Sequence, residues 1–195
     1  MSTQSTRPET QTDLADLIVH LARLGQSTGT TPLTSAQWTA LRYFAHANRQ
    51  SRTPSAFSCF HATTRGTASQ TVKSLVELGL LARQTHESDG RSTLLDVTAA
   101  GHEMLRRDPL EDLRKALARL APQNQRALAA SLGQVAVDLA RLRAAPVFGT
   151  CVDCRHCQIE TDGHFCQQAQ GLVNPNDMAA ICINFQPDSA SRSGL

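Results

Sequence analysis

The sequence predicts a mainly α-helical protein that carries one small β-hairpin and ends in a cysteine-rich segment. Apolar residues recur at intervals of three and four along most of residues 13–142, which is the period of an amphipathic helix. Two short stretches, Leu81–Thr85 and Ser92–Thr98, flank a turn-rich segment whose Asp89-Gly90 pair favours reversal of the chain. Five of the six cysteines lie between residues 151 and 182, which predicts a separate C-terminal segment.

The first two helices have clear start and stop signals. Residues 1–10 are polar and are expected to be disordered. A helix then begins near Asp13, and its apolar pattern stops at Gly25. The second helix begins at Thr34, which forms a capping box with Gln37.

Two further helices precede the hairpin. A short helix over residues 55–62 is expected to bury Phe57 and Phe60, with Cys59 as a small apolar neighbour. The next helix ends at Gly79, where a left-handed residue is needed. Short helices followed by a hairpin are the order of a winged helix-turn-helix.

The region after the hairpin predicts two more amphipathic helical segments. Helical spacing runs from Thr98 to about Leu120, and Asp108-Pro109 is expected to kink or break it. A second helix is expected to begin at Pro122. The apolar rows of these segments exceed what a small winged helix can cover, so we expect them to form a dimer interface with the N-terminal helix.

Four motifs resemble the MarR family of transcriptional regulators. They are LTSAQWTAL at residues 33–41, GTASQTVKSLVELGLL at 66–81, SDGR at 88–91 and LDVTAAG at 95–101. The resemblance covers about residues 12–143. It implies a homodimeric, DNA-binding transcriptional regulator, expected to be a repressor, that reads inverted-repeat half-sites in double-stranded DNA.

The resemblance also implies which residues contact DNA. In that family one helix enters the major groove, and the wing arginine reaches the minor groove or the phosphates. The implied wing residues are Arg91 at the tip and Asp89, which would hold Arg91 in place. The implied groove residues are Arg65, Thr67, Ser69, Gln70 and Lys73.

Charge and composition agree with a DNA-binding protein of the cytoplasm. Residues 38–97 carry seven basic and four acidic side chains, but residues 146–195 carry two and five. We find no secretion signal and no apolar run of the roughly 18 residues that a membrane span needs. The sequence also has no Gly-rich phosphate loop, nucleophile elbow or paired catalytic carboxylates, so we do not expect an enzyme.

The cysteine-rich segment is expected to bind metal. Its spacing is Cys151-x2-Cys154-x2-Cys157-x8-Cys166-x15-Cys182. The segment has too few apolar residues to fold unaided, and disulfides are uncommon in the cytoplasm. Four thiolates are therefore expected to hold one inorganic centre. We expect them to be Cys151, Cys154, Cys166 and Cys182, with Cys157 as an alternative ligand.

The spacing favours an iron-sulfur cluster over zinc. Structural zinc sites with four cysteines usually use two close pairs, whereas here Cys166 and Cys182 stand alone. The run resembles small four-iron proteins, including the final Cys182-x2-Phe185, and so implies a [4Fe-4S] cluster. His156 and His164 are more simply read as neighbours of the ligands than as ligands.

We therefore predict a winged-helix and dimerisation domain over residues 11–145, a cluster segment over 146–187 and a disordered C-terminus over 188–195. As a hypothesis, the presence or redox state of the cluster moves the dimerisation helices and changes DNA binding. One alternative is a zinc-stabilised MarR-type regulator that responds to a small ligand. The other is an electron-transfer or redox module.

Overall fold

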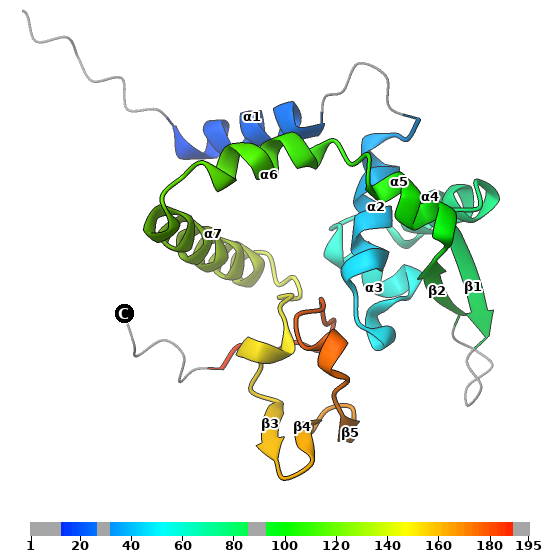
Figure 1. Ribbon diagram of the computed structural model, residues 1–195, viewed down its shortest axis with the longest axis vertical. Coiled ribbons are helices and arrows are strands. Elements are labelled where there is room, and N and C mark those ends of the chain that lie inside the picture. The colour runs from blue at the N-terminus through cyan, green and yellow to red at the C-terminus, as the bar shows by residue number, and fades with distance from the viewer. Residues whose placement is uncertain (1–12, 27–31, 86–92, 189–195) are drawn as a thin grey trace, which may run out of the picture.

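The computed structural model describes residues 13–26, 32–85 and 93–188 of the 195-residue chain. In this view, a cluster of short helices with a hairpin lies on one side, longer helices lie on the other, and the C-terminal segment lies below both (Figure 1). The predicted mainly helical fold is confirmed, and the structure adds a second small sheet in the C-terminal segment.

The winged helix occupies residues 33–97. Its elements are α2 (Ser35–His46), the 3-10 helix η1 (Arg49–Ser51), α3 (Pro54–Phe60), α4 (Arg65–Glu77), β1 (Leu81–Thr85) and β2 (Thr93–Val97). The two strands pair antiparallel, with Leu81 opposite Val97 and Arg83 opposite Leu95. The predicted hairpin is therefore confirmed outside its tip, and residues 86–92 lie outside the described part of the chain.

Apolar burial holds this domain together. Trp38, Leu41 and Phe44 of α2 are at most 2% exposed, and Phe57 of α3 is fully buried. Tyr43 joins them, with its ring centroid 5.2 Å from that of Phe44 and 5.4 Å from that of Phe57. Such edge-to-face and tilted pairs add to the stabilisation that burial gives.

Local sequence signals set the ends of these elements. The predicted capping box is present, because the Thr34 hydroxyl accepts a hydrogen bond from the Gln37 N–H and the Gln37 side chain accepts one from the Thr34 N–H. Gly79 has φ +70°, a left-handed conformation that favours glycine, as predicted. The chain then enters β1 directly, so the wing starts immediately after α4.

Three expectations about this half of the chain are wrong. Phe60 is 37% exposed and Cys59 is exposed, because α3 has only seven residues, about two turns, and its last residues face outward. The first helix, α1 (Leu14–Gln26), continues through Gly25. Residues 49–51 form a 3-10 turn, and Ser51 within it is fully buried.

The remaining helices are α5 (Ala99–Leu105), α6 (Leu110–Ala118) and α7 (Pro122–Leu142). The break before α6 and the start of α7 at Pro122 are as predicted. We call α1, α6 and α7 the helical arm: α1 lies along α6, and α7 turns back toward the C-terminal segment (Figure 1).

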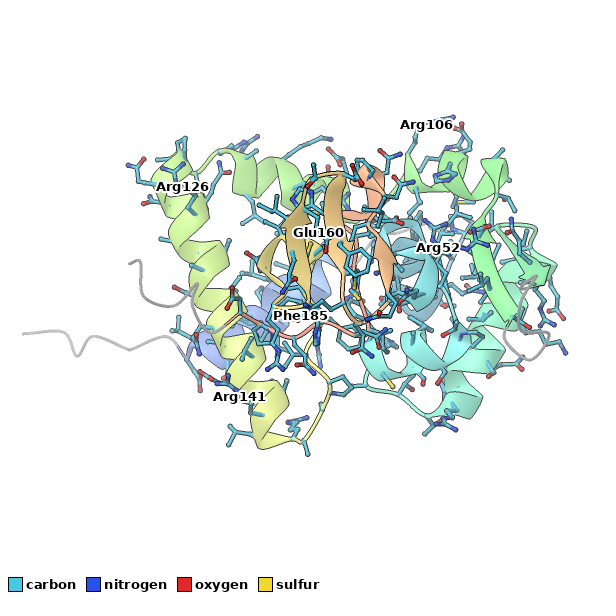
Figure 2. All side chains as sticks on the ribbon, turned by 90° about the horizontal axis from the view of Figure 1, so that it is seen from below. Arg52, Arg106, Arg126, Arg141, Glu160 and Phe185 are labelled. Carbon is cyan, nitrogen blue, oxygen red and sulfur yellow. The ribbon has the colours of Figure 1, made fainter. Side chains whose placement is uncertain are left out.

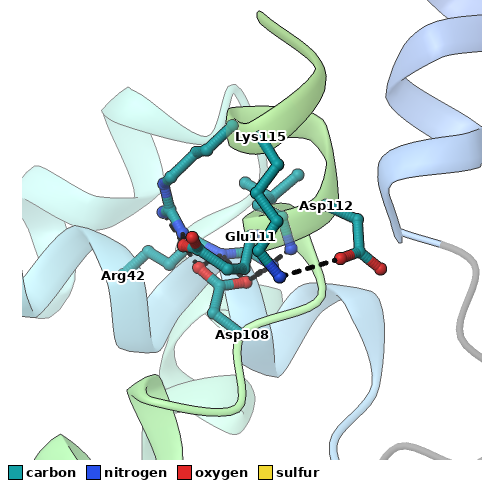
Figure 3. A network of polar contacts seen from close by, with 7 residues as sticks. Arg42, Asp108, Glu111, Asp112 and Lys115 are labelled. Carbon is teal, nitrogen blue, oxygen red and sulfur yellow. Dashed lines mark hydrogen bonds and ion pairs between the residues drawn. The ribbon is translucent and has the colours of Figure 1, made fainter. Parts of the chain in front are cut away.

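A buried ion network joins the helical arm to the winged helix (Figure 3). Asp108, just before α6, accepts hydrogen bonds from Nε and Nη2 of Arg42 on α2, at 3.0 and 2.7 Å. Arg114 of α6 donates to the same carboxylate at 3.0 Å, and so does the Leu110 N–H at 2.9 Å. Burial favours the neutral acid, but these donors outweigh it and hold the pKa of Asp108 below its usual value.

We call residues 146–188 the tail. Its elements are η2 (Cys151–Asp153), β3 (Cys157–Glu160), β4 (Gly163–Cys166), β5 (Gly171–Leu172) and η3 (Pro175–Asp177). The three strands form an antiparallel sheet in the order β3-β4-β5. Figure 2, viewed from below, shows the tail, marked by Glu160 and Phe185, between the winged helix at Arg52 and α7 at Arg126 and Arg141.

Candidate functional site

Helix α4 presents one polar, solvent-facing side. Its buried positions are Ala68, Val72 and Leu75, which face the core. The side chains implied to contact the groove are all exposed on the other side: Arg65, Thr67, Ser69, Gln70 and Lys73.

The start of α4 is held by Thr64, whose hydroxyl accepts from the Thr67 N–H at 3.2 Å. Lys73 lies 3.8 Å from Glu77, a surface pair that water and salt screen. This face therefore offers hydroxyls, an amide and two cationic groups to a partner. Asp89 and Arg91 of the predicted wing lie outside the described residues.

The structure gathers five cysteines of the tail. Cys157 and Cys166 are directly opposite each other in the β3–β4 ladder, so their Cβ atoms lie about 5 Å apart. Cys151 begins η2, and Cys182 pairs with Gly149 through its N–H, which donates to the Gly149 carbonyl at 2.9 Å. Cys151, Cys166 and Cys182 line one open cavity of about 350 Å³.

Burial and neighbouring thiols shift the pKa values of two of these cysteines. Burial, together with Cys182, Cys157, Cys166 and Cys154, raises the pKa of the Cys151 thiol to about 12. Burial and the neighbouring Cys166 and Cys154 likewise raise the pKa of Cys157. Without a positive centre the Cys151 and Cys157 thiols stay protonated at neutral pH, whereas a bound metal ion would stabilise their thiolates.

Three of the thiols line the cavity, and Cys154 and Cys157 lie outside its lining. In residues 13–26, 32–85 and 93–188, no three His, Cys, Asp or Glu side chains are arranged to hold one metal ion. In the same part of the chain, His156 Nε2 is buried and has no hydrogen-bond partner. A buried polar atom without a partner is costly, so this nitrogen fits a polar group that the protein does not itself supply.

A tight turn brings the two ends of the tail together. Phe185 covers Gly149 so closely that a Cβ there would lie 2.6 Å from the ring carbons. Phe148, one residue earlier, packs edge-on against Phe60 of α3 with ring centroids 5.1 Å apart. Phe60 therefore joins the tail to the edge of the core, because its ring also packs against Tyr43 with centroids 4.8 Å apart.

The tail is joined to the winged helix by hydrogen bonds at residues 46–51. The Ile181 N–H donates to the His46 carbonyl at 2.8 Å, and the Asn48 N–H donates back to the Ile181 carbonyl at 3.0 Å. The Ile183 N–H donates to the Ser51 hydroxyl at 2.9 Å. No local pattern in the sequence marks this docking, because its partners are more than 130 residues apart in the chain.

Cys182 lies inside this docking segment. Its neighbours Ile181 and Ile183 pack against the core of the winged helix. Burial raises the pKa of the Cys182 thiol, although the Asn48 side chain and the Asn184 N–H oppose this by donating hydrogen bonds to its sulfur. The predicted metal ligand Cys182 thus lies next to the connection between α2 and α3.

No helix among the described residues is both long and apolar enough to cross a membrane.

Residues 31–92 match the sequence model of the MarR family. No curated protein matches the chain.

Solved structures share the fold. The transcriptional regulator SlyA is 21% identical with a TM-score of 0.55, over 67% of this chain and 96% of SlyA. A MarR transcriptional regulator from Methanosarcina mazei Go1 is 20% identical with a TM-score of 0.53, over 66% and 96%. S. aureus MepR, solved as a DNA complex, is 18% identical with a TM-score of 0.50, over 63% and 93%. The chain therefore shares the fold of these solved regulators, and its residues 31–92 match the MarR family model.

Proposed function

We propose that the protein is a DNA-binding transcriptional repressor of MarR type. The exposed face of α4 carries this proposal, because it presents Arg65, Gln70 and Lys73 on a helix of a size that the major groove admits. Arginine and lysine neutralise phosphates, and glutamine can pair with the edge of adenine. The MepR structure is described as a DNA complex, which agrees with this use of the fold.

The helical arm supports a homodimer. None of the residues of α1, α6 and α7 is buried in the single chain. Leu14 is 71% exposed, Val135 is 55% exposed and Leu142 is 85% exposed, although they lie on amphipathic helices. A second copy of the chain would cover these rows and place two α4 helices over two half-sites of an inverted repeat.

We further propose that the tail holds a [4Fe-4S] cluster through Cys151, Cys154, Cys166 and Cys182, with Cys157 as the alternative ligand. Three of these thiols, those of Cys151, Cys166 and Cys182, line one cavity, and the four irons of a cluster each take one thiolate from a different direction. When bound, such a centre supplies positive charge to the thiolates and a reversible change of oxidation state. The protein's own part is to bury Cys151 and Cys182 and to supply hydrogen bonds to the Cys182 sulfur.

Anaerobic purification of the full chain tests both parts of this proposal. Brown protein with about four irons per chain would support the cluster, and colourless protein with one zinc would replace it by the zinc alternative. A duplex selected from a random library by the full chain then serves as the DNA probe. Equal affinity before and after removal of the metal, at fixed salt, would refute a sensing role. Failure to retain any duplex would refute DNA binding.

A further inference from the structure

We propose that Ser51 is a positioning residue that links the tail to the wing, so that the state of the thiol cluster sets the position of the β1–β2 hairpin. The inference rests on the proposed thiol centre and goes beyond it by naming the residues that carry its effect to the DNA-binding domain. It also differs from the expectation that the cluster acts through the dimerisation helices, which stays a prediction.

On the tail side, Ser51 is hydrogen-bonded to Ile183, the residue that follows Cys182. The Ile183 N–H donates to the Ser51 hydroxyl oxygen at 2.9 Å, and this hydroxyl donates in turn to the Asn48 carboxamide oxygen at 2.7 Å. Asn48 and Cys182 also line the same cavity. Cys182 is therefore connected to Ser51 along the backbone through Ile183, and it lies beside Asn48, the second hydrogen-bond partner of the Ser51 hydroxyl.

On the other side, Ser51 is tied to the winged helix and the wing. Its carbonyl accepts from the Tyr43 hydroxyl at 2.7 Å inside the core. The next residue, Arg52, accepts from the Leu95 N–H of β2 at 2.9 Å and places its Nη1 2.8 Å from the Asp96 carboxylate. The wing strand is thus bonded to the residue that follows the tail contact.

Burial makes this link stiff. Ser51 is fully buried, so a donor or acceptor that loses its partner there cannot turn to water. A displacement of residues 181–183 must then either move Ser51 and Arg52 together or break a buried hydrogen bond. Such a movement reaches α2 through His46 and Tyr43, and it reaches the wing strand β2 through Arg52.

A double-mutant cycle tests the link. Cys182→Ser perturbs the thiol cluster, and Ser51→Ala removes the hydroxyl that accepts from Ile183. Ser58→Ala is the matched control, since Ser58 is a 4% exposed serine whose hydroxyl bonds only locally, to the Ser55 carbonyl at 2.7 Å. Each full chain is measured for hydrogen exchange of the Leu95 amide and for affinity to the selected duplex.

We expect Cys182→Ser to speed exchange at Leu95 about tenfold and to change DNA affinity about fivefold or more. In the Ser51→Ala background the same change should alter both by less than about twofold, while the Ser58→Ala background should keep the full effect. Equal effects of Cys182→Ser in the Ser51→Ala and wild-type backgrounds would overturn the link.

A second pair of variants covers the case in which Ser51→Ala does not fold. Arg52→Gln removes the ion pair with Asp96, whereas Arg141→Gln removes an equal charge and a surface ion pair, with Asp138, on α7. Only Arg52→Gln should weaken the response to Cys182→Ser. Metal content is read separately: wild-type protein without metal refutes the proposed centre, whereas metal that is lost in Cys182→Ser without any change at Leu95 refutes the link alone.

Discussion

The winged helix and the tail are held together by different means. Fifteen apolar side chains are buried in the core of the winged helix, from Leu33 to Leu95. In the tail the only side chains that reach a comparable burial among the described residues are the thiols of Cys151 and Cys182. The first region thus folds by apolar burial, whereas the second depends on its contacts with the first and on what its thiols bind.

The largest effect is expected from breaking the apolar core. Phe57→Ala removes a fully buried ring and should lower the free energy of unfolding by about 3–5 kcal/mol. Ile159→Ala in β3 should change it by less than about 0.5 kcal/mol, because this side chain is 84% exposed. Urea unfolding followed by circular dichroism measures both. Similar losses would mean that the tail has an apolar core of its own.

The ion network of Asp108 tests how firmly the winged helix is joined to the helical arm. Asp108→Asn leaves Arg42, whose side chain is 12% exposed, without a charged partner and should cost about 3 kcal/mol. Asp112→Asn is the matched control, since Asp112 is 88% exposed and pairs with Lys115 on the surface. It should cost less than about 0.5 kcal/mol.

The Asp108 carboxylate should also make the stability of the folded protein fall in acid. The pKa of Asp108 is lower in the folded protein, so its stabilisation is complete above the unfolded pKa of about 3.9. It is lost as the pH falls through the lower, folded value. Wild-type protein should therefore lose stability below about pH 4 more steeply than Asp108→Asn. Parallel acid curves for the two proteins would contradict this account.

Removing single cysteines tests whether the tail depends on a bound metal. Cys166→Ser should weaken metal retention at least tenfold, since it removes a thiolate that lines the cavity. Cys59→Ser, an exposed cysteine of α3, should retain the full metal content. Metal analysis after chelation, with limited proteolysis, measures the outcome. After chelation, the protease should cut the tail and leave the winged helix intact. Equal cleavage of the tail before and after chelation would show that the metal does not order it.

Rules that act over a few residues predicted most of the winged helix. The Thr34–Gln37 capping box, the left-handed Gly79 and the start of α7 at Pro122 each depend on neighbours within one or two turns. The second hairpin was overlooked because its cysteines were treated as ligands. Its sequence carries the same Asp-Gly turn signal as the wing, at Asp162-Gly163.

Long-range docking could not be predicted in this way. Ser51 lies in a polar stretch that is typical of an exposed loop, yet the tail buries it completely. Phe60 was expected in the core because it is aromatic, but it is held at the surface by Phe148, 88 positions later in the chain. Both positions depend on where the tail packs, which no periodicity of the local sequence reports.

The smallest effect is expected from Lys73→Ala, which should change DNA binding by the winged helix without changing metal binding by the tail. Lys73→Ala removes one exposed cation from α4 and should lower affinity for all duplexes about equally, by about fivefold at 0.15 M salt, because one phosphate contact contributes about 0.9 to the salt slope. Glu77→Gln is the control, since it removes the acidic neighbour of Lys73 and keeps the cation. Fluorescence anisotropy against salt concentration should show a slope smaller by about 1 for Lys73→Ala alone, with unchanged metal content. A change in metal content would mean that the two regions do not act separately, and an unchanged slope would place Lys73 away from the phosphates.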